Sequence, residues 1–386
     1  MKNLLPILLL LVLFSSCGGT DTAQNSGSEN ILENFSFTTD TVVVNPGEEI
    51  INLSRGVRNG SLDESKTYFY LFDEVTAQMN KINLDQLILE EQISFEKEGP
   101  NGVGANYITT SRYLPGEEFL FANFQNTGIF NRNGEKVQDL TLKPGDIQVE
   151  GLSENAEYNL TNQIVFSPDR KWMYSLPGDF MEGTNQLAKI KLESKSGNVI
   201  PIPALDKVGD YRILLQSDEI MSIYVEELFL QQIEDSYFLS GGTVNSIYRF
   251  EIGQDSLKLF EFDFSIVPNE KEIPVNNKVS SQKEFESEMK KARGQIGFDK
   301  LLFDENTKRF YRFGRIYETK GDDPDAPLKA QVFLFAFDEN LNLIGETEIP
   351  ELDKVPSSAF FKDGKLWSYV NVDDELGFAV FTLNFN

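Results

Sequence analysis

The sequence lacks several residue types on which common active sites depend. Its 386 residues include no His and a single Cys, Cys17. Without His there can be no Ser-His-Asp triad, no imidazole general base and no His metal ligand. A single Cys cannot form an internal disulfide or a thiolate metal site. These absences exclude the His- and Cys-dependent classes of enzyme and metal centre.

Positive charge is also scarce. The chain has 35 Lys and Arg residues against 61 Asp and Glu residues, which gives a net charge of −26. Nucleic-acid binding depends on Lys and Arg to neutralise phosphates. We therefore expect no nucleic-acid partner.

The N-terminus has the pattern of a targeting segment. Lys2 precedes an apolar run from Leu4 to Phe14, which is too short for a permanent membrane helix of about 20 residues. The sequence Phe14-Ser15-Ser16-Cys17 resembles a bacterial lipoprotein box, in which the Cys is acylated. The alternative is an ordinary cleavage site followed by an unrelated Cys. Because the only Cys lies where the box needs it, we predict a signal peptide over 1–16 and lipidation at Cys17.

Residues 17–34 are rich in Gly, Ser and Asn, a composition typical of a flexible tether. Gly18 follows the Cys, where retention at the inner membrane would favour Asp. By resemblance to lipoprotein sorting, this predicts an outer-membrane lipoprotein of the cell envelope that faces the periplasm or the cell surface. The lipid anchor makes the membrane an expected partner.

The remaining chain, 35–386, is built from repeats. Six segments share an apolar run, a tight polar turn and a second aromatic run, which predicts hairpins: 51–72, 108–124, 164–175, 228–241, 301–313 and 359–370. A third run follows each hairpin, at 79–84, 128–131, 187–192, 246–252, 331–338 and 378–385. A fourth run follows the first five, at 87–95, 137–142, 199–202, 257–264 and 343–349.

The sixth unit has only three runs because the chain stops. An extra strand pattern at 35–44 could supply the missing strand. This arrangement is typical of a closed β-propeller, which leaves only short, protected sheet edges. We predict an all-β, six-bladed β-propeller of four-stranded antiparallel blades, with the last blade completed by the N-terminal strand. The alternative is a pair of β-sandwiches or another β-solenoid.

One repeat unit carries a more specific resemblance. The segments at 95–102, 119–123 and 129–137 resemble an NHL-type propeller repeat, although Asn123 and Gly128 depart from its usual Asp and Arg. The turn at 167–171 (SPDRK) resembles the Ser-Pro-Asp-Gly turn of TolB-like propellers. Together with the lipoprotein box, the whole chain resembles an uncharacterised family of Bacteroidota lipoproteins with a six-bladed propeller, a domain of unknown function. The resemblance implies fold and anchoring, and it carries over no catalytic residue.

One helix is predicted within an insertion at about 266–297. Ser281 and Glu284 form a capping box, and Phe285 begins an apolar face that ends before Gly294. The insertion could form a lid over the channel of the propeller or pack against the flank of a blade. The sequence favours the second arrangement.

Acidic side chains gather in the loops that join the second and third strands of four units. In propellers these loops share one face around the channel, so we define an acidic rim there. The candidate binding residues are Asp73, Asp179, Asp322, Asp323, Asp325, Asp373 and Asp374. Their summed field could attract a cation or a basic protein, or they could be ordinary solvated surface. None of these loops has the regular spacing of a Ca²⁺ loop, so we expect no cofactor, with Ca²⁺ only weakly indicated.

The sequence favours a monomeric binding or scaffold module, whose ligand is a basic protein or a small molecule. The alternative is a metal-dependent hydrolase, similar to lactonases or glycosidases, which uses channel or rim carboxylates. Carboxylates are so plentiful that any pair is expected by chance, and this argues against an enzyme. Trp172 and Trp367 could stack on sugars, but their place within predicted strands favours core packing. Arg55 and Arg58 could face an anion or pair with the acidic rim, and we favour pairing.

Overall fold

The computed structural model describes residues 21–22, 30–58, 60–104, 108–123, 126–142, 144–152, 163–179, 184–216, 220–251, 256–318 and 328–385. Cys17, Asp322, Asp323 and Asp325 lie outside these ranges, so the predictions for them stay open. The described chain has an all-β fold built mainly from four-stranded antiparallel sheets.

Six sheets of four or five strands follow one another along the described chain. The first contains β3 (Gly60–Leu62), β4 (Tyr68–Asp73), β5 (Gln78–Asn83) and β6 (Ile88–Ser94). The second contains β7 (Thr110–Leu114), β8 (Glu118–Ala122), β9 (Thr127–Asn131) and β10 (Lys136–Asp139). The third contains β12 (Ile164–Phe166), β13 (Trp172–Ser175), β16 (Leu187–Lys191) and β17 (Ser196–Ile200), with β11 (Gln148–Glu150) parallel to β17.

The other three sheets use the same order of strands. The fourth contains β20 (Leu228–Ile233), β21 (Ser236–Gly241), β22 (Ile247–Glu251) and β23 (Lys258–Glu261), with β1 (Asp21–Thr22) parallel to β23. The fifth contains β25 (Gly297–Asp304), β26 (Arg309–Tyr317), β27 (Ala330–Phe337) and β28 (Leu343–Glu348). The sixth contains β29 (Phe360–Lys362), β30 (Lys365–Val372), β31 (Glu375–Asn384) and β2 (Ser36–Val43).

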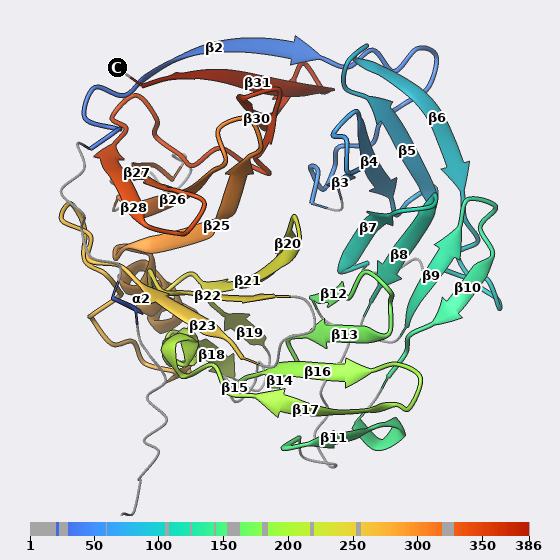
Figure 1. The fold of residues 1–386 in the computed structure, drawn as a ribbon, viewed down its shortest axis with the longest axis horizontal. Helices are drawn as coiled ribbons and strands as arrows, with labels where there is room; N and C mark the ends of the chain where they lie inside the picture. The colour runs from blue at the N-terminus through green and yellow to red at the C-terminus, as the bar shows by residue number, and fades with distance from the viewer. Residues whose placement is uncertain are drawn as a thin grey trace, which may run out of the picture.

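These sheets are arranged around a common centre, with their first strands innermost and their last strands at the periphery (Figure 1). A sheet with neighbours on both faces needs apolar residues on both sides of its middle strands. β4 meets this need, because five consecutive residues from Phe69 to Asp73 are buried. The aromatic run that the sequence shows there is therefore core on both faces.

Aromatic rings fill the spaces between neighbouring sheets. Phe264 stacks on Phe335 with ring centroids 3.9 Å apart, and Tyr70 stacks on Tyr113 at 4.5 Å. Trp367 is 9% exposed and packs against Phe378. Trp172 packs against the core between the third and fourth sheets. Both Trp residues therefore belong to the core, as the sequence favoured.

The N-terminal strand lies beside the C-terminal strand. β2 pairs antiparallel with β31, in a register that runs from Ser36 opposite Asn384 to Val43 opposite Gly377. The two ends of the described fold thus share one sheet (Figure 1). The sequence predicted that residues 35–44 supply the missing strand of the last unit, and β2 is that strand.

The residues just before β2 are also folded, although the sequence assigned them to the tether. Ile31 donates its backbone N–H to the Ile344 carbonyl at 3.0 Å, and the side chain of Asn30 bonds the backbone of Glu346. Leu32 is fully buried. A Cβ on Gly345 would lie 2.9 Å from Leu32, so the glycine lets this segment pack closely on β28. Residues 30–34 therefore belong to the folded body.

The predicted helix is present at α2 (Gln282–Arg293), and Gly294 is its C-cap. The Ser281 hydroxyl accepts from the Glu284 N–H, and the Glu284 carboxylate accepts from the Ser280 N–H at 3.1 Å. Phe285 and Ala292 are buried against a small sheet formed by β18 (Ile213–Gln216), β19 (Met221–Tyr224) and β24 (Lys278–Val279). In Figure 1 the helix lies at the periphery of the ring.

The smaller elements are the helix α1 (Lys207–Asp210), the 3₁₀ turns Pro144–Asp146 and Pro203–Leu205, and the hairpin of β14 (Gly178–Asp179) with β15 (Thr184–Asn185). Among the described residues, no helix has both the length and the apolar character needed to cross a membrane.

Candidate functional site

The acidic rim predicted from the sequence is only partly described, and its described carboxylates take part in local turns. Asp73 is 8% exposed, and its carboxylate accepts from the Val75 N–H and the Thr76 hydroxyl, both at 2.8 Å. Asn52 bonds it as well, at 3.0 Å. Asp304 makes the same pair of bonds to the turn that follows it. Asp73 therefore holds a turn, and its oxygens are already used.

Asp373 and Asp374 form the tight turn between β30 and β31. Their φ angles are 51° and 70°, as a two-residue type I′ hairpin turn requires. The Asp374 N–H donates to the Asn371 side chain at 2.9 Å. Of Asp179, only the backbone is described, at the end of β14. No group of three or more Asp, Glu, His or Cys residues that could hold a metal ion occurs in the described ranges.

Arg55, which the sequence placed near the channel, pairs with Glu74 at 2.5 Å. The sequence favoured a buried pairing with the acidic rim; Arg55 does pair with a carboxylate next to Asp73, but the Arg55 side chain is 58% exposed, so the pair is not buried.

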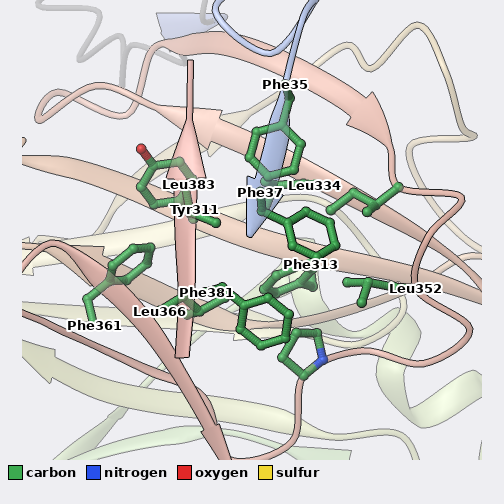
Figure 2. Close-up of a pocket in the computed structure, with 12 residues that line it drawn as sticks. Phe35, Phe37, Tyr311, Phe313, Leu334, Leu352, Phe361, Leu366, Phe381 and Leu383 are labelled. Atoms are coloured by element: carbon green, nitrogen blue, oxygen red, sulfur yellow. The ribbon is translucent and has the colours of Figure 1, made fainter. Parts of the chain in front are cut away.

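An apolar pocket lies between the fifth and sixth sheets (Figure 2). It is lined by twelve apolar or aromatic residues, among them Phe37, Phe313 and Phe381. Most of the lining residues belong to one hydrophobic cluster that joins the two sheets. Because the Tyr311 hydroxyl is the one polar side-chain group among these twelve residues, and ligand sites usually have several, we regard the pocket as a packing gap in the core.

Charged side chains converge instead where the fourth and fifth sheets meet. We call this group the charged junction; it consists of Glu226, Glu227, Lys271, Arg293, Asp299, Lys300, Arg312 and Arg315. The two glutamates immediately precede β20, the first strand of its sheet. Asp299 and Lys300 lie near the start of β25, and Arg315 lies near the end of β26. These positions share one face, because first strands begin and second strands end at the same side of the ring.

A buried ion pair forms one side of the junction. Lys271 Nζ lies 3.2 Å from Glu226 Oε1, and the side chains are 2% and 8% exposed. Lys271 also donates to the Ala292 carbonyl at 2.5 Å, and the Tyr224 hydroxyl donates to Glu226 at 2.7 Å. Burial lowers the pKa of Lys271, and the negative charge of Glu226 partly offsets this shift. Both charges of this pair are therefore satisfied within the protein.

Arginines hold the other side of the junction. Arg315 pairs with Asp299, and although burial lowers the pKa of Arg315, the Asp299 charge raises it above its usual range. Arg312 is fully buried and donates to three backbone carbonyls, those of Asp299 at 2.7 Å, Asn245 at 2.7 Å and Gly241 at 2.8 Å. Burial lowers the pKa of Arg312 to about 9. Arg312 thus ties the β25 backbone to the fourth sheet.

Glu227 and Lys300 differ from the rest of the junction. Each side chain reaches solvent, and in the described part of the chain neither makes a side-chain hydrogen bond or an ion pair within 4.0 Å. Even so, burial among surrounding atoms raises the pKa of Glu227 and lowers the pKa of Lys300. Crowded ionisable groups that reach water and have perturbed pKa values are typical of functional sites. These two residues are the members of the junction that are available to a ligand.

Sequence reasoning missed this junction. Its members come from two connections, one helix and two strands, and Lys271 and Glu226 are 45 positions apart in the numbering. One signal was present: Asp299-Lys300 interrupts the apolar run of β25, and the pairing of β25 with β26 is irregular between Phe298 and Leu301. A β-bulge next to a functional site is a common arrangement.

A family model described as a domain of unknown function, DUF4221, matches residues 32–348. The chain belongs to the DUF4221 family. The match begins at the buried Leu32 and ends at the last residue of β28, so it contains the whole charged junction. The resemblance to a domain of unknown function with a propeller fold is thereby confirmed.

Solved structures agree with the family. A DUF4221 member from Bacteroides vulgatus is 14% identical, with a TM-score of 0.66, 91% of this chain covered and 99% of that chain. A protein from Bacteroides fragilis, described as exported, is 9% identical, with a TM-score of 0.51, 93% of this chain covered and 97% of that chain. The β-propeller domain of Cps50 (Swd1) from Myceliophteria thermophila is 11% identical, with a TM-score of 0.42, 88% of this chain covered and 89% of that chain. Among curated proteins, none matches the chain.

At these identities the likeness to solved structures concerns the fold alone. The DUF4221 fold is shared over nearly the whole length of the member from Bacteroides vulgatus. The chemistry of the charged junction must therefore be argued from the residues of this chain.

Proposed function

We propose that this DUF4221 protein is a lipid-anchored propeller of the cell envelope that binds a small ligand at the charged junction. The observation that carries the binding role is the pair Glu227 and Lys300. Both reach water without a partner in the described chain, while Lys271, Arg312 and Arg315 are each held by partners within the protein. Unpaired charges held in a crowded place cost stability, and a protein retains such groups when they have a role in binding.

The proposal includes a ring of six blades closed by the N-terminal strand. Six sheets of at least four strands among the described residues, and the pairing of β2 with β31, support it. In such a ring the face that carries the charged junction also carries the connections between blades. Binding there can change with the loops while the blades keep the fold.

The envelope location rests on Cys17 and on the segment before it. The apolar run, the lipoprotein box and Gly18 support an outer-membrane lipoprotein that faces the periplasm or the surface. The similar protein from Bacteroides fragilis is described as exported, which is consistent with such a location. We propose that the protein acts as a monomer and needs no cofactor. That the acidic rim takes Ca²⁺ or a basic protein stays a prediction from the sequence.

The binding role is testable by native mass spectrometry of the purified mature protein, mixed with the small-molecule fraction of its own cell envelope. We expect a bound mass on the wild type that is lost in the double variant Glu227→Gln, Lys300→Gln. The variant Asp373→Asn, Asp374→Asn is the matched control, because it also removes charge from this face and should keep the bound mass. Absence of a bound mass on the wild type would refute the binding role. A bound mass that survives in the junction variant would place the ligand elsewhere.

A further inference from the structure

We infer that the outer flank of the fourth and fifth sheets lies against the lipid surface of the membrane, so that the anchored protein stands on its edge. We call this surface the anchor flank; it consists of β23, residues 262–266 and β28. The inference rests on the proposed lipid anchor at Cys17, and it adds the side of the protein that meets the membrane.

The chain between the proposed anchor and the fold is short. Asp21 and Thr22 form β1, which pairs parallel with β23 at Phe260 and Glu261. Three residues separate Cys17 from Asp21, and a stretch of this length spans at most about 14 Å when fully extended. An acylated Cys17 would therefore keep the outer edge of the fourth sheet within about this distance of the lipid headgroups.

The next described part of the N-terminal segment lies on the same flank. The Asn30 side chain donates to the Glu346 carbonyl at 2.9 Å and accepts from the Glu346 N–H at 3.1 Å. The Glu346 carboxylate accepts in turn from the Ser265 N–H at 3.1 Å, which joins the connection after β23 to β28. Both strands lie at the periphery of the ring (Figure 1). The described residues before β2 are therefore attached to outer strands at two places.

A large apolar side chain on this flank is exposed. Ile266 is 41% exposed, whereas Phe264, two residues earlier, is 6% exposed and packs in the core between the two sheets. On a flank that is held beside the headgroups, an exposed isoleucine gains free energy by entering the membrane interface. Glu261 and Asp263 are also exposed there, and an anionic lipid surface would repel them. The contact therefore depends on the anchor and the apolar side chain rather than on charge.

This orientation keeps the charged junction away from the lipid. The fourth sheet has the order β1-β23-β22-β21-β20, and Glu226 and Glu227 precede β20, its innermost strand. Neighbouring strands are about 4.8 Å apart, so β20 lies about 14 Å from β23. The anchor holds the outermost strands, and the proposed binding residues are set back from the membrane by the width of the sheet.

Fluorescence quenching by lipids tests the inference at Ile266. The full mature lipoprotein carries a bimane label at Ile266→Cys and is reconstituted into phosphatidylcholine vesicles that contain brominated acyl chains. The matched control is a label at Val137→Cys, because Val137 is 50% exposed and lies on β10, the outer strand of the second sheet. We expect several-fold stronger quenching at position 266 than at position 137. Equal quenching at both positions, in protein that sediments with the vesicles, would overturn the inference.

Two further readouts separate this inference from the anchor on which it rests. Unchanged Tm values show that both labelled variants are folded, and adding Cys17→Ser should abolish sedimentation with the vesicles and the quenching at position 266. If the lipidated protein sediments with the vesicles but the two labels are quenched equally, the anchor stands and the flank is wrong. If quenching at position 266 persists after Cys17→Ser, the flank meets lipid through its own side chains and the anchor is wrong.

Discussion

At the scale of single residues, the junction joins two kinds of charged side chain. Glu226, Lys271 and Arg315 each have a partner of opposite charge, and they shape the site without being free to react. Glu227 and Lys300 have none within 4.0 Å in the described chain, and their pKa values move in opposite directions, both because of burial. The protein is therefore less stable than it would be with neutral side chains at these two positions.

This cost gives a pH-dependent prediction for Glu227. Burial raises its pKa above the ordinary value of 4.5, with Arg315 and Lys300 opposing and Asp299 and Glu226 adding to the shift. Below the unfolded pKa both states are protonated, and as the pH rises through the folded pKa the wild type loses stability. Glu227→Gln should therefore raise the Tm at pH 7 and leave it unchanged near pH 4, as measured by calorimetry.

The matched control is Glu351→Gln, which removes the same charge from an exposed position. If both variants raise the Tm equally at pH 7, the gain would come from net charge alone. That result would contradict the local account of Glu227.

Arg312 gives a prediction of opposite sign. Arg312→Met leaves three carbonyls without their donor, and unpaired buried polar groups are costly. We expect a loss of about 3 kcal/mol or more in the free energy of unfolding, measured in guanidinium chloride. Arg132, which bonds Glu91 and Glu117 and whose side chain is 44% exposed, is the control. Arg132→Met removes only exposed ion pairs and should cost far less stability, whereas equal losses would show that Arg312 is not a structural link.

The sequence could locate some of these residues but not their roles. Asp73 lies in the loop where the repeat placed it, but only the structure shows that Asn52, Val75 and Thr76 already use its oxygens. Lys300 was not singled out from the sequence, and its lack of a partner in the described chain depends in part on Glu226 and Asp299, which pair with Lys271 and Arg315. Such a balance is set by residues distant in sequence, and it is invisible in any one segment.

At the scale of elements, local sequence patterns were sufficient to predict those strands and helix ends whose structure depends on neighbouring residues. The hairpin runs became strands, and the capping box at Ser281 became the start of α2. The segment at 30–34 was assigned to the tether, because its two apolar residues, Ile31 and Leu32, stand among polar ones. Leu32 is buried only because Gly345, more than 300 residues later, leaves room for it.

Truncation tests how much residues 30–34 and β2 each contribute to stability. A chain that starts at Phe35 should be less stable than one that starts at Asn30 by about 2 kcal/mol, the value of burying one Leu. A chain that starts at Asn45 also loses β2 and exposes the edge of β31, so it should be severely destabilised or unfolded. Thermal unfolding followed by circular dichroism measures all three. Equal Tm values for the chains from Asn30 and Asn45 would contradict closure of the ring by β2.

At the scale of the whole molecule, the number of repeats and the pairing of the N-terminal and C-terminal strands agree with a ring. The apolar residues and the charged residues of the junction occupy different parts of this ring. The blades supply the apolar core, and one face carries the charged junction. The N-terminal segment carries the predicted anchor.

The anchor predicts a simple change of location. Cys17→Ser removes the only thiol in the chain and with it the acyl chains that we propose hold the protein in the membrane. The variant should appear in the soluble fraction, while the wild type sediments with the membranes, as followed by immunoblotting. A variant that still sediments with the membranes would contradict lipidation at Cys17.

The central claim is that a ligand binds at the charged junction, and hydrogen exchange tests it most directly. Amide exchange of the mature protein is measured by mass spectrometry with and without the small-molecule fraction of its own cell envelope. We predict slower exchange in the segments 224–231 and 297–303, with no change around Asp73 or in the turn at Asp373 and Asp374. Protection at other segments alone, or unchanged exchange at the junction, would contradict the account.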